Sequence, residues 1–228
     1  MDKNILPLFQ LCDSNFPTGA FSHSYGLESY IQENMVYDQE TFIKWLQIYI
    51  KEQLIHSDGL TCHLVYQALE EGNYPKVWKM DRLLTVQNLP RETREGTQRM
   101  GEQMLNLVSS MYKAPVLSVY KRRIETKQSF GHPSIVFTMV AHYLEIPKPT
   151  AILFYLYSVV SSLVQNAVRG IPLGQTAGQK VLHDVQTILL EAVEKIEQMD
   201  EEDFGIVSPG IELSQMRHER VNIRIFMS

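Results

Sequence analysis

The residues best suited to chemistry lie within one short stretch, residues 15–28, which reads NFPTGAFSHSYGLE. A catalytic serine needs a base within hydrogen-bond reach and a carboxylate that orients the base, and Ser22, His23, Ser24 and Glu28 offer these groups. Side chains that are adjacent on a helix point in different directions, and the stretch lacks the G-x-S-x-G elbow that presents a nucleophile between a strand and a helix. The pattern therefore favours a turn and a helix start over a catalytic triad.

Turn-forming residues in this stretch separate two predicted helices. Pro17 and Gly19 end a helix that begins near residue 5, and Ser22 or Ser24 has the side chain needed to cap the next helix. We therefore expect these four residues to have structural roles.

Other catalytic or metal sites have weaker support. A hydrolase built on a helical bundle would use Cys62 or Ser22, but no base stands at a plausible fixed spacing from either residue. The seven histidines form neither an HExxH pair nor a Glu-x-x-His set. The stretch LGQTAGQK lacks the spacing of a phosphate-binding P-loop. We expect no enzymatic activity, no tightly bound metal and no cofactor.

The composition favours a soluble, cytoplasmic protein. The chain has 228 residues, a net charge of -5 and a pI of about 5.8, so no overall positive field attracts nucleic acid. Two cysteines are too few for a disulfide framework, which indicates a reducing compartment. The longest apolar run, residues 151–164, is shorter than the about 20 residues needed to span a bilayer, so we expect a buried helix and no membrane segment.

Apolar residues recur at spacings of three and four along most of the chain, which is the helical period. A turn at residues 57–59 separates two of the predicted elements. Helices are predicted over residues 38–53, 59–69, 75–84, 90–111, 115–124, 134–145, 151–169 and 173–196. The sequence therefore predicts an all-α fold, a single-domain bundle of about eight to ten helices that includes residues 1–228.

Prolines and glycines mark the joint before the last long helix. Pro172 breaks the preceding helix, and Gly174 and Gly178, one turn apart, would let a neighbouring helix approach closely. Elsewhere, residues 121–127 form a dense basic cluster, which is expected to be a solvated helical face, with docking of an acidic protein as the alternative.

The C-terminal tail, residues 205–228, has a different pattern. Val221, Ile223, Ile225 and Met227 recur with a period of two residues, which is not the helical period. A terminal segment with this much apolar content must dock on its own core or be covered by another protein. We therefore expect an extended or partner-ordered docking tail.

Four stretches together resemble the urease accessory protein UreF family. They are NFPTGAFSHSYGLE, RETREGTQRMGEQML, VRGIPLGQTAGQKVL and HERVNIRIFMS. The matches occur in the family's order and extend over nearly the whole chain.

The resemblance implies an all-helical, non-enzymatic homodimer that serves as a chaperone in nickel insertion. The implied partners are UreD (also called UreH), the GTPase UreG and apo-urease, and the assembly handles nickel only transiently. In this family the tail resembles a docking element for the partner. Candidate partner-binding residues here are Pro209, Arg217, His218, Glu219, Arg220, Arg224, Phe226 and Ser228.

The implied homodimer needs an interface, and the apolar helix over residues 151–164 is our expectation for it. A helix that is hydrophobic on all sides has more apolar surface than one protomer can cover. We place the interface at Leu153, Tyr155 and Tyr157.

Two functions remain open for the implied complex. The chain is a scaffold that binds UreD through its tail and N-terminal region and recruits UreG, or it regulates UreG as an activator or fidelity checkpoint. A regulator would supply an arginine in trans, and Arg217, Arg220 and Arg224 in the tail are the candidates.

Overall fold

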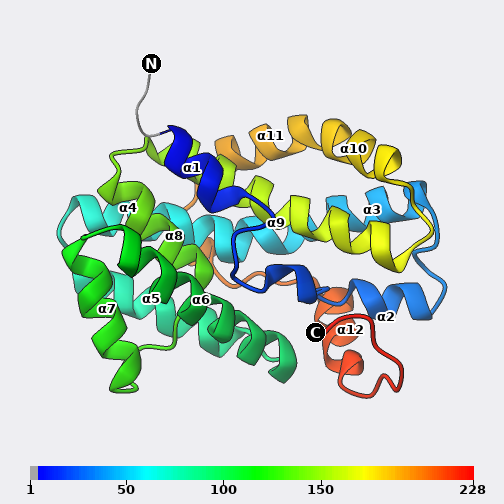
Figure 1. The fold of residues 1–228 in the computed structure, drawn as a ribbon, viewed down its shortest axis with the longest axis horizontal. Coiled ribbons are helices and arrows are strands. Elements are labelled where there is room, and N and C mark those ends of the chain that lie inside the picture. Colours follow the sequence, from blue (N-terminus) through cyan, green and yellow to red (C-terminus); the bar gives the residue numbers. More distant parts are fainter. Residues whose placement is uncertain (1–4) are drawn as a thin grey trace.

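The computed structural model describes residues 5–228, and these residues form an all-α bundle without a strand (Figure 1). The first half of the chain contains α1 (Ile5–Cys12), α2 (Leu27–Gln32), α3 (Gln39–Tyr49), α4 (Leu60–Glu70), α5 (Tyr74–Gln87) and α6 (Arg91–Met111). The second half contains α7 (Pro115–Glu125), α8 (Pro133–Tyr143), α9 (Lys148–Gly170), α10 (Gln175–Asp184), α11 (Gln186–Glu197) and α12 (Pro209–His218). The all-α prediction is confirmed.

Several helices begin at capping residues or at prolines, which favour a helix start. Asp38 caps α3 and forms a capping box with Thr41, and Asn73 accepts a hydrogen bond from the first turn of α5. A proline stands in the first turn of α5, α7, α8, α9 and α12, where its missing N–H costs nothing.

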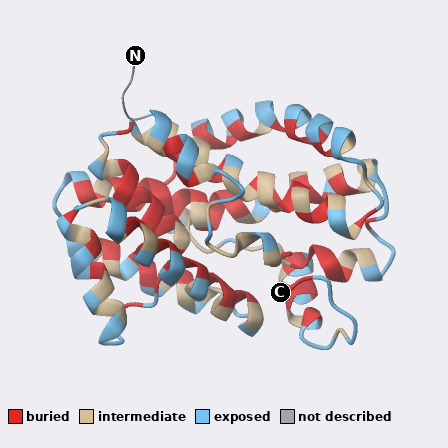
Figure 2. Cartoon of the chain, in the orientation of Figure 1, coloured by how far each residue is buried: buried red, intermediate tan, exposed pale blue. Residues whose placement is uncertain are grey.

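One continuous hydrophobic core lies where α4, α6, α8 and α9 pack together (Figure 2). Residues 134–141 of α8 are all buried, because other helices cover every side of α8. Helix α9 contacts α1, α4, α8, α10 and α11. By length and composition alone α9 could cross a membrane, but half of its most apolar window is buried against these helices. We interpret it as the central core helix.

The turn predicted at residues 57–59 is wrong. A π-helical segment, η2 (Ile50–Gly59), joins α3 to α4 without a break. Gly59 has helical dihedral angles, and a Cβ there would lie 2.6 Å from Ile196 Cδ1. The glycine therefore permits close packing against α11 and does not form a turn.

The single helix predicted over residues 173–196 is two helices, α10 and α11, which meet at Val185. Both pack on α9, and the bend keeps Val181, Val185 and Leu189 buried. Pro172 and Gly174 lie in the joint, and Gly174 is the N-cap of α10.

The two glycines of this joint differ in their surroundings. A Cβ on Gly178 would lie 2.9 Å from Val168 Cγ2 of α9, so this glycine does admit a neighbouring helix. A Cβ on Gly174 would have no atom within 4 Å, so the expectation of a close approach is wrong for Gly174.

Tyr155 is buried in the core of its own chain, where its hydroxyl donates a 2.7 Å hydrogen bond to Asp58. It is therefore not available for an interface between protomers, and that part of the expectation is wrong. Leu153 is half-buried, and Tyr157 is 38% exposed. These two residues remain the predicted interface on α9.

Candidate docking site at the C-terminal tail

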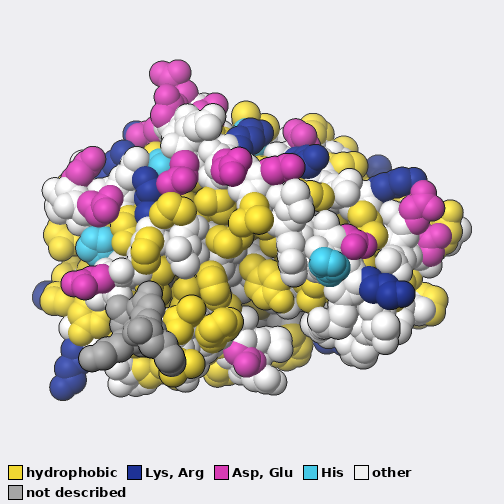
Figure 3. Space-filling model, turned by 90° about the horizontal axis from the view of Figure 1, so that it is seen from above, with side chains coloured by type: hydrophobic (Ala, Val, Ile, Leu, Met, Phe, Trp, Pro, Cys, Tyr) yellow, Lys and Arg dark blue, Asp and Glu magenta, His cyan; other side chains and the backbone are white. Residues whose placement is uncertain are grey.

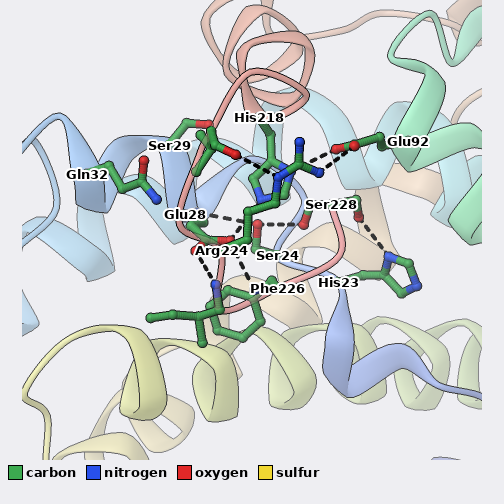
Figure 4. Close-up of polar contacts among 12 residues, drawn as sticks. His23, Ser24, Glu28, Ser29, Gln32, Glu92, His218, Arg224, Phe226 and Ser228 are labelled. Atoms are coloured by element: carbon green, nitrogen blue, oxygen red, sulfur yellow. Dashed lines mark hydrogen bonds and ion pairs between the residues drawn. The ribbon is translucent and has the colours of Figure 1, made fainter.

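The C-terminal tail folds back onto its own chain. After α11 comes a 3₁₀ turn, η3 (Glu201–Asp203), and then α12, which packs on α2 and α6. The remaining residues, 219–228, which we call the C-terminal loop, form no strand and return to the start of α2 (Figures 1 and 4). The two-residue period therefore does not reflect an extended strand.

Glu28 on α2 holds the C-terminal loop in place. Its side chain is buried, and Oε1 accepts a 2.6 Å hydrogen bond from the backbone amide of Ile225. Oε2 accepts hydrogen bonds from the amide of Phe226 at 3.1 Å and from His218 Nε2 at 2.8 Å. One carboxylate thus satisfies two backbone donors of the loop and one side chain of α12.

His218 lies between two carboxylates. Its Nδ1 is 2.9 Å from Glu92 Oε2, and its Nε2 faces Glu28. Glu92 Oε1 accepts a 2.6 Å hydrogen bond from Arg224, whose other nitrogens donate to the carbonyl oxygens of Glu219 and Val221. We call Glu28, Glu92, His218 and Arg224 the tail-binding network (Figure 4).

The tail-binding network brings two acidic side chains against one imidazole and one guanidinium. Burial alone would raise the pKa of Glu92. The hydrogen bonds from His218 and Arg224 outweigh burial and hold this pKa below its ordinary value.

The end of the C-terminal loop is bound by the stretch that drew attention in the sequence. The main-chain oxygen of Ser228 accepts hydrogen bonds from the amide and the hydroxyl of Ser24, at 2.5 and 2.6 Å. Ser228 Oγ lies 2.7 Å from His23 Nδ1, and the amide of Met227 donates to the carbonyl of Ser22. Residues 22–24 therefore contact the C-terminal loop, and this contact was not predicted.

His23 is buried against Gly96 of α6, where a Cβ would overlap the imidazole ring. Burial lowers the pKa of His23 to about 4, and the positive charges of Arg99 and His218 add to this effect. The ring is therefore neutral at pH 7.

The expected capping roles of the serines are only partly met. Gly26 is the N-cap of α2 and offers no side chain, and Ser24 Oγ accepts only a long 3.4 Å hydrogen bond from the amide of Glu28. Ser22 caps no helix, because its hydroxyl donates to the carbonyl of Gly19 within a 3₁₀ turn, η1 (Ala20–Ser22). Gly19 itself has a positive φ of 86°, which suits glycine, and Pro17 precedes it in the exposed turn.

The outward face of the C-terminal loop is apolar. Ile223, Ile225 and Met227 are 84%, 59% and 55% exposed, and we call them the exposed apolar triplet. Phe226 and Ser228 point inward and are buried, and the Phe226 ring packs under the guanidinium of Arg169. From residue 225 to residue 228 the two-residue period thus separates an outward side from an inward side, whereas Asn222 and Arg224 are exposed like Ile223.

Three residues expected to bind a partner are buried within the chain. His218, Phe226 and Ser228 hold the loop in place. The prediction that they contact a partner directly is therefore wrong in this conformation. The exposed members of the set lie on α12 and in the C-terminal loop. Pro209 begins α12, Arg217 pairs with Glu33, Glu219 accepts a hydrogen bond from the amide of Arg91, and the Arg220 side chain has no hydrogen-bond partner among residues 5–228.

The hydrolase hypothesis gains no support from the geometry. The Cys62 thiol is buried and points at the carbonyl of Ser134, and burial raises its pKa well above the ordinary range. Within residues 5–228, no group of three His, Cys, Asp or Glu side chains is arranged to hold a metal ion. Neither Cys62 nor Ser22 is placed as an activated nucleophile.

Glu92, Ser29 and Gln32 contribute to this site but were not identified from sequence. Ser29 donates to the carbonyl of Ser214, and Gln32 donates to the carbonyl of Ile223 at 2.9 Å. These contacts join residues more than 120 positions apart, and no local pattern signals them. The only signal for Glu92 is its place in the RETREG stretch.

Comparison with known proteins agrees with the four-motif resemblance. A family model for UreF matches residues 36–186, which is more than half of the chain. "Urease accessory protein UreF" of Lachnoclostridium phytofermentans is 52% identical over 228 residues and covers all of both chains. The protein of the same name from Bacillus sp. strain TB-90 is 51% identical over 226 residues, 99% of this chain and all of its own. The family model does not extend to the tail, but both relatives do.

Proposed function

Because the chain belongs to the UreF family of urease accessory proteins, and is thus a urease maturation factor, we propose that it acts as a non-enzymatic scaffold. It binds UreD (UreH) through the C-terminal loop and recruits the GTPase UreG, so that nickel reaches apo-urease. Nickel is the cargo of the assembly and not a resident cofactor of this chain. The proposal places the complex in the cytoplasm.

The exposed apolar triplet is the observation that carries the proposal. Ile223, Ile225 and Met227 stand on one short loop and point away from the body of the molecule. Exposed apolar side chains grouped in this way mark interaction surfaces. A groove between α2 and the loop, lined by Ile31, Gly170 and the loop itself, continues the apolar surface.

The rigidity of the loop supports the same proposal. The tail-binding network, together with Gln32 and Ser24, fixes both the backbone and the end of the loop. A loop that is ordered before binding loses less conformational entropy on association. The triplet is therefore presented in a fixed arrangement.

Co-purification with UreD tests the scaffold. Deleting residues 222–228 removes the triplet, and the truncated chain should no longer retain UreD. Undiminished recovery of UreD would refute docking through the loop. Adding nucleotide-loaded UreG to the parent chain with and without UreD, and following GTP hydrolysis, separates recruitment from activation.

A regulator of UreG is the second candidate, and Arg220 is the best candidate among the three tail arginines. Arg217 pairs with Glu33, and all three guanidinium nitrogens of Arg224 are hydrogen-bonded within the chain. Arg220 is exposed, and its guanidinium has no partner among residues 5–228. If an arginine completes the UreG active site, Arg220→Ala should slow GTP hydrolysis without loss of assembly. Loss of assembly instead would favour the scaffold.

We also propose a homodimer through α1 and α9. Leu6 and Phe9 of α1 are exposed, the Phe9 ring packs edge-on against Phe154, and Leu153 and Tyr157 lie on the same helix as Phe154. Figure 3 shows hydrophobic side chains gathered over the centre of one face, near the start of α1. A second copy of the chain would cover this apolar surface.

A further inference from the structure

A polar cavity lies beneath the C-terminal helix, apart from the tail-binding network. Its volume is about 50 Å³, and each residue that lines it is buried or half-buried. The wall comes from η2, from the α5–α6 junction, from the start of α8 and from α12. The cavity thus lies between the centre of the bundle and the tail.

The π-helical segment explains why polar side chains face this cavity. A π-helix closes its hydrogen bonds between residues i and i+5, so residues four or five apart share one face. Tyr49, Gln53, Ser57 and Asp58 have this spacing, and all four line the cavity. An α-helix over the same residues would turn part of this set away.

Three oxygen atoms on the wall make no hydrogen bond to protein atoms. They are Thr93 Oγ1, Gln53 Oε1 and Gln87 Oε1, and each atom is buried. Thr93 is 4% exposed. A buried polar atom without a partner destabilises the folded state, so native proteins satisfy such atoms with protein groups or with ordered water.

The remaining polar groups of the wall can form further hydrogen bonds with water. Asp58 accepts hydrogen bonds from Tyr155 at 2.7 Å and from Ser57 at 3.2 Å, which uses only part of its capacity. Glu212 and Gln215 of α12 line the same cavity, and Gln215 donates a hydrogen bond to the carbonyl of Tyr25. At the share of liquid volume that one water takes, about 30 Å³, the cavity has room for about two water molecules.

We propose that this cavity holds a cluster of ordered water molecules that joins the π-helical segment to the C-terminal helix. The water donates to Gln53, Gln87 and Asp58 and exchanges hydrogen bonds with Thr93. Among residues 5–228, no hydrogen bond joins α12 directly to η2. The helix that positions the C-terminal loop therefore meets this side of the bundle through water.

A high-resolution crystal structure of the full chain tests the proposal directly. Ordered waters within about 2.7–3.2 Å of Thr93 Oγ1 and of at least one of the two glutamine side chains are expected. A cavity without electron density would overturn the proposal. A single peak surrounded by oxygen atoms at about 2.0–2.6 Å would also overturn it, because such distances belong to a metal ion.

Thermal unfolding of two matched variants provides an independent test. Thr93 and Thr61 both have a buried hydroxyl without a protein partner, but only Thr93 lines the cavity. Replacing a hydroxyl that binds water should lower the melting temperature, by about 2–4 °C for Thr93→Val. Replacing an isolated hydroxyl should leave the temperature unchanged or raise it, as expected for Thr61→Val. If Thr93→Val also fails to lower the melting temperature, the cavity is dry and the proposal is wrong.

Discussion

At the scale of single residues, Glu28 determines where the C-terminal loop lies. It is a buried carboxylate that accepts two backbone hydrogen bonds and one from His218. The charge is tolerated because the groups that face it, two backbone amides and the His218 ring, can all donate hydrogen bonds. Loss of the charge should therefore release the loop before it unfolds the bundle.

Replacing Glu28 by glutamine should free the C-terminal loop. The amides of Ile225 and Phe226 donate to different oxygens of Glu28. Glutamine replaces one of these oxygens by an NH₂ group, which is itself a donor, so the two hydrogen bonds cannot both survive. Breaking a buried pair of this kind costs about 3 kcal/mol, and the amides of residues 225 and 226 should exchange about a hundredfold faster. Hydrogen exchange followed by mass spectrometry measures this change.

Glu33→Gln is the matched control for the Glu28 variant. Glu33 follows the same helix, but it pairs with Arg217 at the surface, where an ion pair contributes less than about 1 kcal/mol. Exchange of the loop amides should therefore remain unchanged. Equal exchange rates in the Glu28 and Glu33 variants would refute the role assigned to Glu28.

The buried imidazole of His23 should make stability depend on pH. Its pKa is about 4 in the folded chain and about 6.5 when unfolded, so the unfolded state binds the proton first as pH falls. The free energy of unfolding is unaffected by this residue above pH 6.5. Between pH 6.5 and 4 it declines, and His23 accounts for at most about 3 kcal/mol of the decline.

Urea unfolding at pH 7 and at pH 4.5 measures this dependence. Between the two pH values, the free energy of unfolding should fall by about 2 kcal/mol less for His23→Gln than for the parent chain. The exposed His183 supplies the control, and His183→Gln should show the parent's loss. The same loss in all three proteins would contradict a neutral, buried His23.

About half of this site can be predicted from the sequence. The stretch at residues 15–28 stands out for its polar groups, and in the structure His23, Ser24 and Glu28 all hydrogen-bond to the C-terminal loop. Their partners Glu92 and Ser228 lie far away in sequence, so the choice between a catalytic, a capping and a loop-binding role could not be made from local spacing. The exposure of the residues in the C-terminal loop likewise depends on which backbone amides Glu28 binds.

At the scale of elements, helix periodicity predicted most of the bundle because apolar residues must face the core every three or four positions. Three elements departed from it, and one of them is α12, a helix within residues 205–228, where an extended or partner-ordered tail is expected. The π-helical segment keeps α3 and α4 continuous where Ser57, Asp58 and Gly59 favoured a turn, because tertiary packing against α11 overrides the local preference. The bend at Val185 has no glycine or proline to signal it.

Close contacts between elements make certain glycines irreplaceable. Gly101 lies in the middle of α6, where alanine would normally stabilise a helix by about 1 kcal/mol. A Cβ there would lie 2.6 Å from the backbone nitrogen of His132, which cannot move like a flexible side chain. Gly101→Ala should therefore lower the free energy of unfolding by about 1–3 kcal/mol in chemical denaturation.

Gly174→Ala is the control for this prediction. A Cβ at Gly174 would have no neighbour within 4 Å, and the backbone has an ordinary negative φ. The free energy of unfolding should change by less than about 0.5 kcal/mol. Stabilisation by Gly101→Ala would show that α6 does not contact the start of α8 as closely as described.

At the scale of the whole molecule, the chain combines one core with two apolar surfaces. One is the exposed apolar triplet of the C-terminal loop, and the other lies on α1 and α9. The sequence could not separate these surfaces from the core, since α9 is apolar on most of its circumference. Only the packing shows that Tyr155 faces inward while Tyr157 faces outward.

Replacing Tyr157 by aspartate should dissociate the proposed homodimer. A charge placed in an apolar interface loses its hydration without gaining a partner, while on the monomer the side chain is solvated. Gel filtration with light scattering should show a dimer for the parent chain and a monomer for the variant. Tyr74→Asp, which changes an exposed residue at the start of α5, should remain dimeric, and a dimeric Tyr157 variant would refute this interface.

The affinity of the full-length chain for UreD, measured by titration calorimetry, tests the docking of the C-terminal loop most directly. Ile223→Asp changes a side chain that is 84% exposed and leaves the tail-binding network intact, whereas Val119→Asp changes an exposed residue on α7, at the opposite end of the molecule (Figure 1). The account predicts at least about tenfold weaker binding for Ile223→Asp, as expected for an apolar side chain at the centre of an interface, and unchanged binding for Val119→Asp. Parent-like affinity of the Ile223 variant would contradict it.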